Sequence, residues 1–314
     1  MPRRAFTPIE AAAIFNCVMA KHSMSVRATP TDFVFGDKCI FLGISLDGEE
    51  RADNLFDQLF PRSSEGVYHH YTTYGGFKGI VSSGTVRLFN LHKRFGSGEF
   101  RTFCRDHGLD GYLKSGKGDA DEGYFSDLMN DLFYISLVGE DTSDSIHCWE
   151  RFAADHRGVR LSFKIRLAHN YRNFRAVTYQ KPDCIPAFRE IKEAYAAHGL
   201  TFINSGLSRM PGFYQRKDFT CQSEHRLLAK RFPGAPNEFP FAVHEEGKGS
   251  IKFIESDLTT QEHPWFNLEL LSITAGGNCT LQNVRKYLKN NSQFPNLPAA
   301  GVEPIEHGYC VAQI

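Results

Sequence analysis

Two adjacent histidines in an aromatic stretch are the first residues along the chain whose types and spacing could do chemistry. They lie in VYHHYTT, residues 67–73, whose aromatic and β-branched content predicts a β-strand. His69 and His70 would point to opposite faces of that strand, because successive side chains alternate. One metal ion therefore cannot bind both, and the sequence contains neither HxxxH nor HExxH. We expect no metal site, and only one of the two rings in any one site.

A second polar group lies in CQSEHR, residues 221–226. Gln222 and Glu224 are two residues apart, so in a strand both side chains lie on one face, while Ser223 points to the other. They would form a polar pair that could bind a reacting group. The alternative is a solvent-facing polar edge of a strand, and the spacing alone does not choose between the two.

Two glycine-rich stretches give little support for a phosphate-binding loop. GSG at 96–98 and SGKGD at 115–119 lack the context of a strand, GxxxxGK[ST] and a helix. Residues 96–124 contain seven glycines. Long irregular loops inside a domain are usually functional lids or disordered segments, so we expect a long mobile segment here.

The overall composition is that of an ordinary globular protein of 314 residues, with 41% hydrophobic and 23% charged residues. Lys plus Arg number 36, as do Asp plus Glu, so net charge gives no global argument for binding nucleic acid or a membrane. No run of about 18 apolar residues is present, and Glu10 interrupts the apolar run that a secretory signal would need. Eight cysteines without a CxxC pair indicate reduced thiols and a cytoplasmic protein.

Helical and strand patterns are mixed along the chain, without regular βαβ alternation. A helix is expected over 7–22, where Thr7, Pro8 and Glu10 supply the N-cap, the first turn and a capping box. A shorter helix is expected to end at Gly84. Aromatic and β-branched runs predict strands at 85–90, 132–140, 159–165, 174–180 and 218–232. These elements predict an α+β protein with a largely antiparallel sheet.

The chain is expected to divide into three parts. Residues 1–66 are interpreted as an N-terminal extension or small accessory module, because Pro61 and RSSEG mark a boundary. The main domain is expected over 67–295, followed by a C-terminal tail over 296–314.

Several stretches taken together resemble a bacterial family of unknown function that looks like a member of the ADP-ribosyltransferase superfamily. HHYTTYGGFKGIVSSGTVRLFN resembles its His-Tyr-Thr strand, short helix and second strand. FYISLVGE resembles its serine-bearing strand, CWERFAADHRGVRLSF its tryptophan-containing helix and next strand, and FTCQSEHRLLAK its acidic late strand. FNLELLSITAGGNCTLQNVRKYL resembles its closing strand, glycine turn and helix. The resemblance covers about residues 66–290 and implies a split, largely antiparallel sheet with flanking helices.

The chain departs from that family at two places. The family usually carries Asn-Asp after the second strand, where this sequence has LHKRFGSGEF and Glu99 as its only acid. It often carries an acid two residues before the late glutamate, where this sequence has Gln222. Gln-x-Glu recurs in active ADP-ribosyltransferases, so the second departure favours activity.

The resemblance implies that NAD is the co-substrate and is cleaved between nicotinamide and ribose C1′. The transition state of such a cleavage has oxocarbenium character. Glu224 would bind the ribose and stabilise the cationic sugar, and Gln222 would orient the acceptor. His70 would anchor NAD, with Thr72 beside it on the same face.

The same resemblance gives two residues of the central strand a place at the site. Ser136 would steady the site through Glu224 or the nicotinamide ribose, and Tyr134, on the same face, would stack on the nicotinamide. The alternatives are a core histidine at His70 and a plain strand serine at Ser136. For Trp149 we expect a core role, with contact to a ligand as the alternative.

Basic and aromatic residues alternate in NLHKRF (90–95) and GFYQRKDF (212–219). Interleaved cations and rings suit a single-stranded nucleic acid, and a solvated loop is the alternative. An RNA or DNA acceptor would be expected to contact the basic and aromatic residues of these stretches, namely Arg94, Phe213, Tyr214, Arg216 and Lys217.

The sequence therefore predicts a mono-ADP-ribosyltransferase that transfers ADP-ribose to a nucleic acid, RNA among them, or to a protein. By analogy with related folds, its setting would be that of a toxin or phage-defence effector, with an antitoxin protein as partner. The alternatives are a catalytically inactive nucleotide-binding or interaction module, and an NAD glycohydrolase in which water replaces the acceptor.

Overall fold

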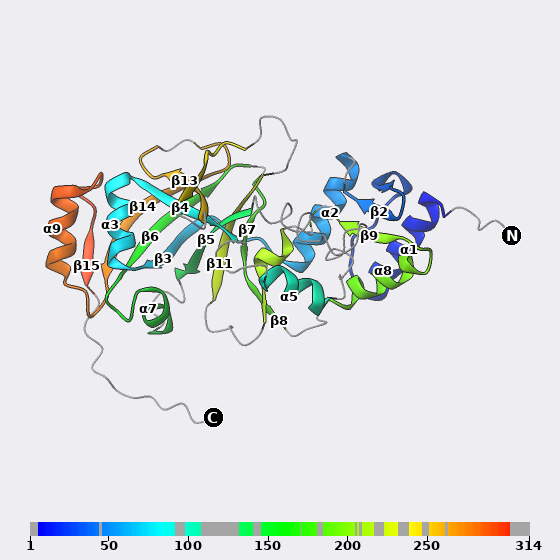
Figure 1. Ribbon diagram of the computed structural model, residues 1–314, viewed down its shortest axis with the longest axis horizontal. Coiled ribbons are helices and arrows are strands. Elements are labelled where there is room, and N and C mark those ends of the chain that lie inside the picture. Colours follow the sequence, from blue (N-terminus) through cyan, green and yellow to red (C-terminus); the bar gives the residue numbers. More distant parts are fainter. Residues whose placement is uncertain are drawn as a thin grey trace, which may run out of the picture.

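The computed structural model describes residues 6–43, 46–91, 98–107, 132–140, 146–169, 171–180, 185–204, 206, 209–216, 223–231, 239–246, 251–260 and 263–301. Along its longest axis, a large β-sheet with its helices stands beside a smaller, mainly helical lobe (Figure 1). Within the described residues, no helix is both long and apolar enough to cross a membrane.

One large sheet carries most of the strands. Its members are β3 (Gly66–Thr72), β4 (Thr85–Asn90), β5 (Leu132–Gly139), β6 (Val159–Leu167), β7 (Phe174–Ala176), β11 (Glu224–Lys230), β12 (Val243–Glu246), β13 (Ile251–Asp257), β14 (Phe266–Ala275) and β15 (Ala299–Gly301). The hydrogen-bonded order is β12-β13-β4-β5-β3-β6-β14-β15, with β11 beside β5 and β7 beside β11. Among these described strands, β14 and β15 pair in parallel and the other pairs are antiparallel. The predicted α+β class and largely antiparallel sheet are confirmed.

The sheet divides at β5, because three strands form hydrogen bonds with it. β11 pairs with β5 over 132–138. In the described ladders, β4 meets β5 at 133–134 and β3 meets it at 138–139. Since β11 occupies one edge of β5, β3 and β4 share the other edge and diverge between these two points. Residues 135–137 of β5 therefore face a gap in the sheet.

Helices cover both faces of this sheet. They are α3 (Tyr74–Ser83) and α9 (Leu281–Asn291) on one face and α7 (Ile146–Phe152) on the other (Figure 1). Phe77 of α3 and Val284 of α9 share a core cluster with Leu161 of β6. On the opposite face, Trp149 of α7 meets Tyr71 of β3 edge to face, with ring centroids 5.0 Å apart. Trp149 is buried in the core, as expected from the sequence.

The small lobe consists of residues 6–60 and 185–213, two segments far apart in the sequence. Its elements are α1 (Pro8–Lys21), β1 (Phe33–Phe35), β2 (Cys39–Leu42), α2 (Leu46–Leu59), α8 (Pro186–Ala196), β9 (Thr201–Asn204) and the 3-10 turn η5 (Met210–Phe213). β9 pairs in parallel with β2, and the Tyr195 hydroxyl donates to the Ala11 carbonyl, 2.9 Å away. Residues 185–213 thus complete the N-terminal module expected over 1–66.

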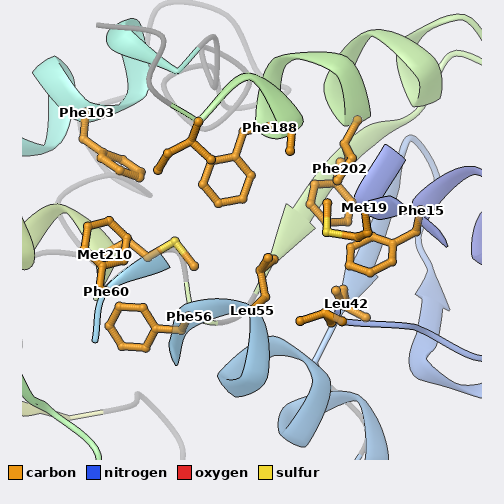
Figure 2. Packing of buried hydrophobic residues seen from close by; sticks show 14 of the residues in the cluster. Phe15, Met19, Leu42, Leu55, Phe56, Phe60, Phe103, Phe188, Phe202 and Met210 are labelled. Carbon is orange, nitrogen blue, oxygen red and sulfur yellow. The ribbon is translucent and has the colours of Figure 1, made fainter. Parts of the chain in front are cut away.

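Buried rings and aliphatic side chains from both segments fill the core of the small lobe. Phe15, Leu42 and Leu55 of the first segment point toward Phe188 and Phe202 of the second (Figure 2). Neither segment could bury these side chains alone, so the lobe depends on both.

Three local expectations meet different outcomes. α1 begins with the predicted capping box, in which Thr7 accepts from the Glu10 amide and the Glu10 carboxylate accepts from Thr7. The irregular segment expected over 96–124 is wrong for 98–106, which form α5 (Gly98–Asp106), and residues 108–124 lie outside the described part. The strand expected over 174–180 is divided into β7 and β8 (Thr178–Gln180), because Val177 donates to the Glu224 carbonyl and β8 pairs with β10 (Tyr214–Arg216).

The shared core predicts that the sheet lobe does not fold properly without the N-terminal segment. A fragment starting at residue 67 leaves Phe188, Ile191, Tyr195 and Phe202 of the small lobe without their partners. We expect it to aggregate or to bind a hydrophobic dye strongly, and to lose the single cooperative thermal transition of the full chain. A fragment that unfolds cooperatively at the temperature of the full chain would contradict this.

Candidate functional site

Three neighbouring strands, β11, β5 and β3, bring the predicted site residues together. Val138 of β5 lies directly opposite Glu224 of β11 on one side and His69 of β3 on the other. Directly opposed residues in a sheet point to the same face. Because side chains alternate, Ser136 and Tyr134 of β5 also lie on the face of Glu224. The three strands thus bring together polar residues that lie far apart in the sequence, namely His69, Ser136 and Glu224.

The Glu224 carboxylate is buried and has three hydrogen-bond donors. Only 7% of the residue is exposed. The Ser136 hydroxyl donates to Oε1. Arg226, two residues along β11, donates from Nε to Oε1 at 2.7 Å and from Nη2 to Oε2 at 3.1 Å. Burying a carboxylate is costly unless it is paired and hydrogen-bonded, and these contacts meet that condition.

The predicted role of Ser136 as a group that steadies the site through Glu224 fits this geometry. The Ser136 backbone also takes part, since its carbonyl oxygen lies 2.9 Å from Nδ1 of His70. That carbonyl belongs to the stretch of β5 that faces the gap between β3 and β4. The His70 ring therefore closes the gap where backbone pairing is interrupted.

The sheet faces on which the two histidines lie are the reverse of those expected. The register places His69, not His70, on the face of Glu224, and His69 Nδ1 lies 3.0 Å from the Ser162 hydroxyl. The expectation that His69 faces away from the site is wrong, because the face was assigned from the resemblance and not from the pairing. His70 reaches the site through the Ser136 backbone. Thr72 lies at the end of β3, its hydroxyl against the Cα region of Gly76.

Tyr134 does not present a ring face to a ligand in this structure. It is fully buried, and the Arg226 guanidinium lies over its ring, 5.1 Å from the centroid. The predicted stacking on nicotinamide is therefore wrong for this conformation. Tyr134 instead supports the arginine that holds Glu224.

Of the residues predicted to line a nucleic-acid acceptor, the three that the structure describes do not form an exposed basic surface. Phe213 and Tyr214 are buried in the core of the small lobe, and the Tyr214 hydroxyl donates to Asp106 at 2.8 Å. Arg216 is half-exposed but donates to both oxygens of the same carboxylate. Arg94, Lys217 and Gln222 lie outside the described residues.

The contacts around Asp106 hold its charge in place. Burial acts to raise the pKa of the Asp106 carboxyl, but hydrogen bonds from Arg216 and Tyr214 outweigh it, and the pKa is lowered. Arg216 therefore pairs with a carboxylate of the fold itself. The basic and aromatic stretch around it in the sequence suggested a binding role, because the sequence does not show this partner.

His225 lies on the opposite face of β11 from Glu224. Its Nδ1 is 2.7 Å from the Ser63 hydroxyl, and Tyr68 meets its ring with centroids 5.0 Å apart. Burial lowers the pKa of His225, although the nearby Glu224 charge acts in the other direction. This contact ties the segment between the two lobes to the strand that carries Glu224.

The backbone immediately before Glu224 is unusual. Ser223 has φ 40°, a left-handed conformation that costs energy for residues other than glycine. The Glu224 amide donates to the Tyr179 hydroxyl, 3.3 Å away. The turn at Ser223 thus fixes the direction in which the chain enters β11.

Apart from Ser136, the sequence analysis did not single out the residues that hold Glu224 and its strand in place. Arg226 is visible in SEHR two residues after the glutamate, so a charge of opposite sign on the same strand face was the available signal. Ser63 and Tyr179 carried no such signal, because their contacts depend on the tertiary fold. Among the residues that the structure describes, no cluster of three His, Cys, Asp or Glu side chains could hold a metal ion.

The face of β11, β5 and β3 can bind and orient a hydroxylated ligand. It offers a carboxylate held in a fixed position, with a serine hydroxyl beside it and an imidazole on the next strand. Such groups recognise sugar hydroxyls and can stabilise positive charge on a sugar ring.

The left-handed backbone at Ser223 predicts a specific response to substitution. Ser223→Val should lower the free energy of unfolding by about 1–3 kcal/mol, because a β-branched side chain is strained at positive φ. Ser223→Gly should be nearly neutral. Urea denaturation measures both changes in stability. Ser64→Val is the matched control, because Ser64 is exposed and its φ is not positive. Equal costs for the two valine variants would contradict the assignment.

The lowered pKa of His225 predicts that stability falls as the solution is acidified. The folded state binds fewer protons at this ring than the unfolded state, so the contribution is complete above about pH 6.5 and is lost as pH falls below it. Urea denaturation between pH 7.5 and 5.5 should show this slope, and His225→Gln should reduce it. His244→Gln, at an exposed histidine, should leave the slope unchanged.

No protein-family model matches the chain, and neither the curated proteins nor the solved structures include a significant match.

Proposed function

We propose that this protein is an NAD-dependent mono-ADP-ribosyltransferase of the cytoplasm. The observation that carries the proposal is the joining of Glu224, Ser136 and His70 across three adjacent strands. Ser136 donates to Glu224 from 88 residues away, and His70 contacts the Ser136 carbonyl from 66 residues away. The resemblance in sequence had assigned these three residues to one site before their contacts were known.

In the proposed reaction, the bond between ribose C1′ and the nicotinamide nitrogen breaks, and its electron pair leaves with nicotinamide. Positive charge then develops on the sugar ring, as in glycoside cleavage. Glu224 accepts a hydrogen bond from a ribose hydroxyl and stabilises that charge. The acceptor, which Gln222 would orient, forms the new bond to C1′ and releases its proton to water.

The residues around Glu224 support this role by limiting its motion. Ser136 and Arg226 fix the carboxylate before NAD binds, so little reorganisation is needed when the sugar becomes cationic. His70 borders the gap beside Ser136 and is proposed to bind a hydroxyl of NAD, while His69 lies on the sheet face of Glu224.

The acceptor is proposed to be a macromolecule, either a nucleic acid or a protein, in the setting of a toxin or defence effector. One observation favours the alternative of a catalytically inactive module: Arg226 contacts both oxygens of Glu224 and partly neutralises it. The NAD glycohydrolase alternative has no separate support in the described contacts. The two alternatives are outcomes of the test below.

Labelled NAD added to the purified protein with cell extract tests the proposal. Label should transfer to macromolecules, and separate recovery of RNA, DNA and protein should identify the acceptor class. Glu224→Gln keeps the size of the side chain but removes its charge, so transfer should fall at least about 100-fold. Glu269→Gln, which removes a half-exposed carboxylate paired with Arg166 on β6, should leave transfer unchanged.

Other results would replace the proposal with a defined alternative. Free ADP-ribose without transfer would indicate a glycohydrolase. Binding of NAD without turnover would indicate an inactive module. Transfer that is equal in Glu224→Gln and the wild type would exclude Glu224 as the catalytic carboxylate.

A further inference from the structure

Arg226 lies at the centre of the candidate site, although the proposed reaction gives it no contact with NAD or the acceptor. It is 1% exposed and is among the largest fully buried side chains in the described residues. Its location on β11 places it on the face of Glu224 and opposite Ser136 of β5. Burying a charged guanidinium is costly unless it is paired and hydrogen-bonded, so its contacts identify the groups that offset this cost.

One edge of the guanidinium holds the carboxylate of Glu224 through two parallel hydrogen bonds. Nε contacts Oε1 and Nη2 contacts Oε2. This fork fixes the plane of the carboxylate as well as its distance, which a lysine could not do. A carboxylate offers about four acceptor positions. Arg226 and Ser136 fill three of them in the described contacts, which leaves one on Oε2 for a ligand hydroxyl.

The rest of the guanidinium is fixed by groups outside β11. Nη1 donates to the Gly212 carbonyl at 2.9 Å, and the Tyr134 ring lies 5.1 Å away on the flat side. Gly212 belongs to η5, whose neighbours Met210 and Phe213 are part of the small-lobe core. The small lobe thus sets the position of Arg226.

A second buried arginine extends this link. Arg175 of β7 lies directly opposite Arg226 in the ladder, and its Nη2 donates to Asp57 of α2 at 2.5 Å. Each arginine therefore has its own carboxylate, Glu224 in one case and Asp57 in the other. Asp57 also accepts from Arg62 and its pKa is lowered, because these two cations outweigh the effect of burial.

We propose that Arg226 is a positioning residue for Glu224, which transmits the location of the small lobe to the orientation of the carboxylate. This role rests on the proposed function. Arg226 does not contact the co-substrate. It sets the direction of Oε2, so that the ribose hydroxyl is bound in the orientation that the charged sugar requires.

Steady-state kinetics with labelled NAD test the role in Arg226→Gln, Arg226→Lys and the matched control Arg166→Gln. Arg166 forms a half-exposed ion pair with Glu269 across β6 and β14, away from the site. Arg226→Gln should lower kcat about 100-fold with KM for NAD changed less than about threefold, because a small misplacement costs this much. Arg226→Lys should recover part of kcat. Arg166→Gln should match the wild type.

Loss of folding is separated from loss of positioning by a stability cycle. Arg226→Gln leaves Glu224 buried without its cation and should lower the melting temperature. The double variant Glu224→Gln, Arg226→Gln should recover part of that loss, since no charge is then left unpaired. Values of kcat are compared at a temperature where circular dichroism shows each variant to be folded.

Each outcome decides the role. An unchanged kcat in folded Arg226→Gln overturns it, and so does a raised KM with unchanged kcat, which would make Arg226 a binding residue for NAD. Additive losses of stability in the cycle would show that the two side chains are not coupled. Absence of NAD turnover in the wild type is a failure of the proposed function itself, which the first measurement detects before any variant is compared.

Discussion

The ion pair between Glu224 and Arg226 is the interaction on which the candidate site depends. Both groups are almost fully buried, and burying either charge without the other would be costly. Each therefore restricts its neighbour, and both depend on the strands and the small-lobe segment around them. The face that carries this pair also contributes apolar side chains such as Leu132 and Leu228 to the small-lobe core, whereas on the opposite face β5 contributes Ile135 and Leu137 to a second apolar core.

Because strand pairing along one edge of β5 is interrupted, a side chain of a third strand, β3, can reach the backbone of β5. A regular antiparallel sheet would pair β5 along its whole edge with one neighbour, and its carbonyl groups would all be occupied. Here β3 and β4 each pair with only a part of that edge in the described ladders. The Ser136 carbonyl is then available for the His70 ring. The gap and the contacts of Ser136 with both His70 and Glu224 are thus parts of one arrangement.

Local sequence patterns predicted the local structure well. The capping box at Thr7 and Glu10, the turn at Gly84 and the strand over 85–90 all depend on a few adjacent residues, and all are observed. The α+β class followed from the mixture of periods. Failures occurred where tertiary pairing decides the outcome. The helix at 98–106 buries Phe103 under the small lobe, which its glycine-rich surroundings concealed.

The candidate site was predicted in part for the same reason. Glu224 and Ser136 were placed together correctly, because the resemblance assigned both to one site, which a two-residue period within each strand could not do. The histidine facing Glu224 could not be chosen without the register between β3 and β5. Phe213 and Tyr214 looked like binding residues in the sequence, but an apolar core competes for the same side chains. The function proposed from these residues remains a prediction that the comparisons with known proteins do not test.

The interleaving of the two lobes has a consequence for the synthesis of the protein on the ribosome. Chains fold as they emerge, with N-terminal parts first. The small lobe begins with residues 6–60 but is completed only by 185–213, and β11, which carries Glu224 and Arg226, follows directly after it. A nascent chain therefore cannot form the candidate site until the lobe that positions Arg226 has all its parts. The order of the elements along the chain therefore delays the site until β11 has been synthesised, well after the first segment of the small lobe.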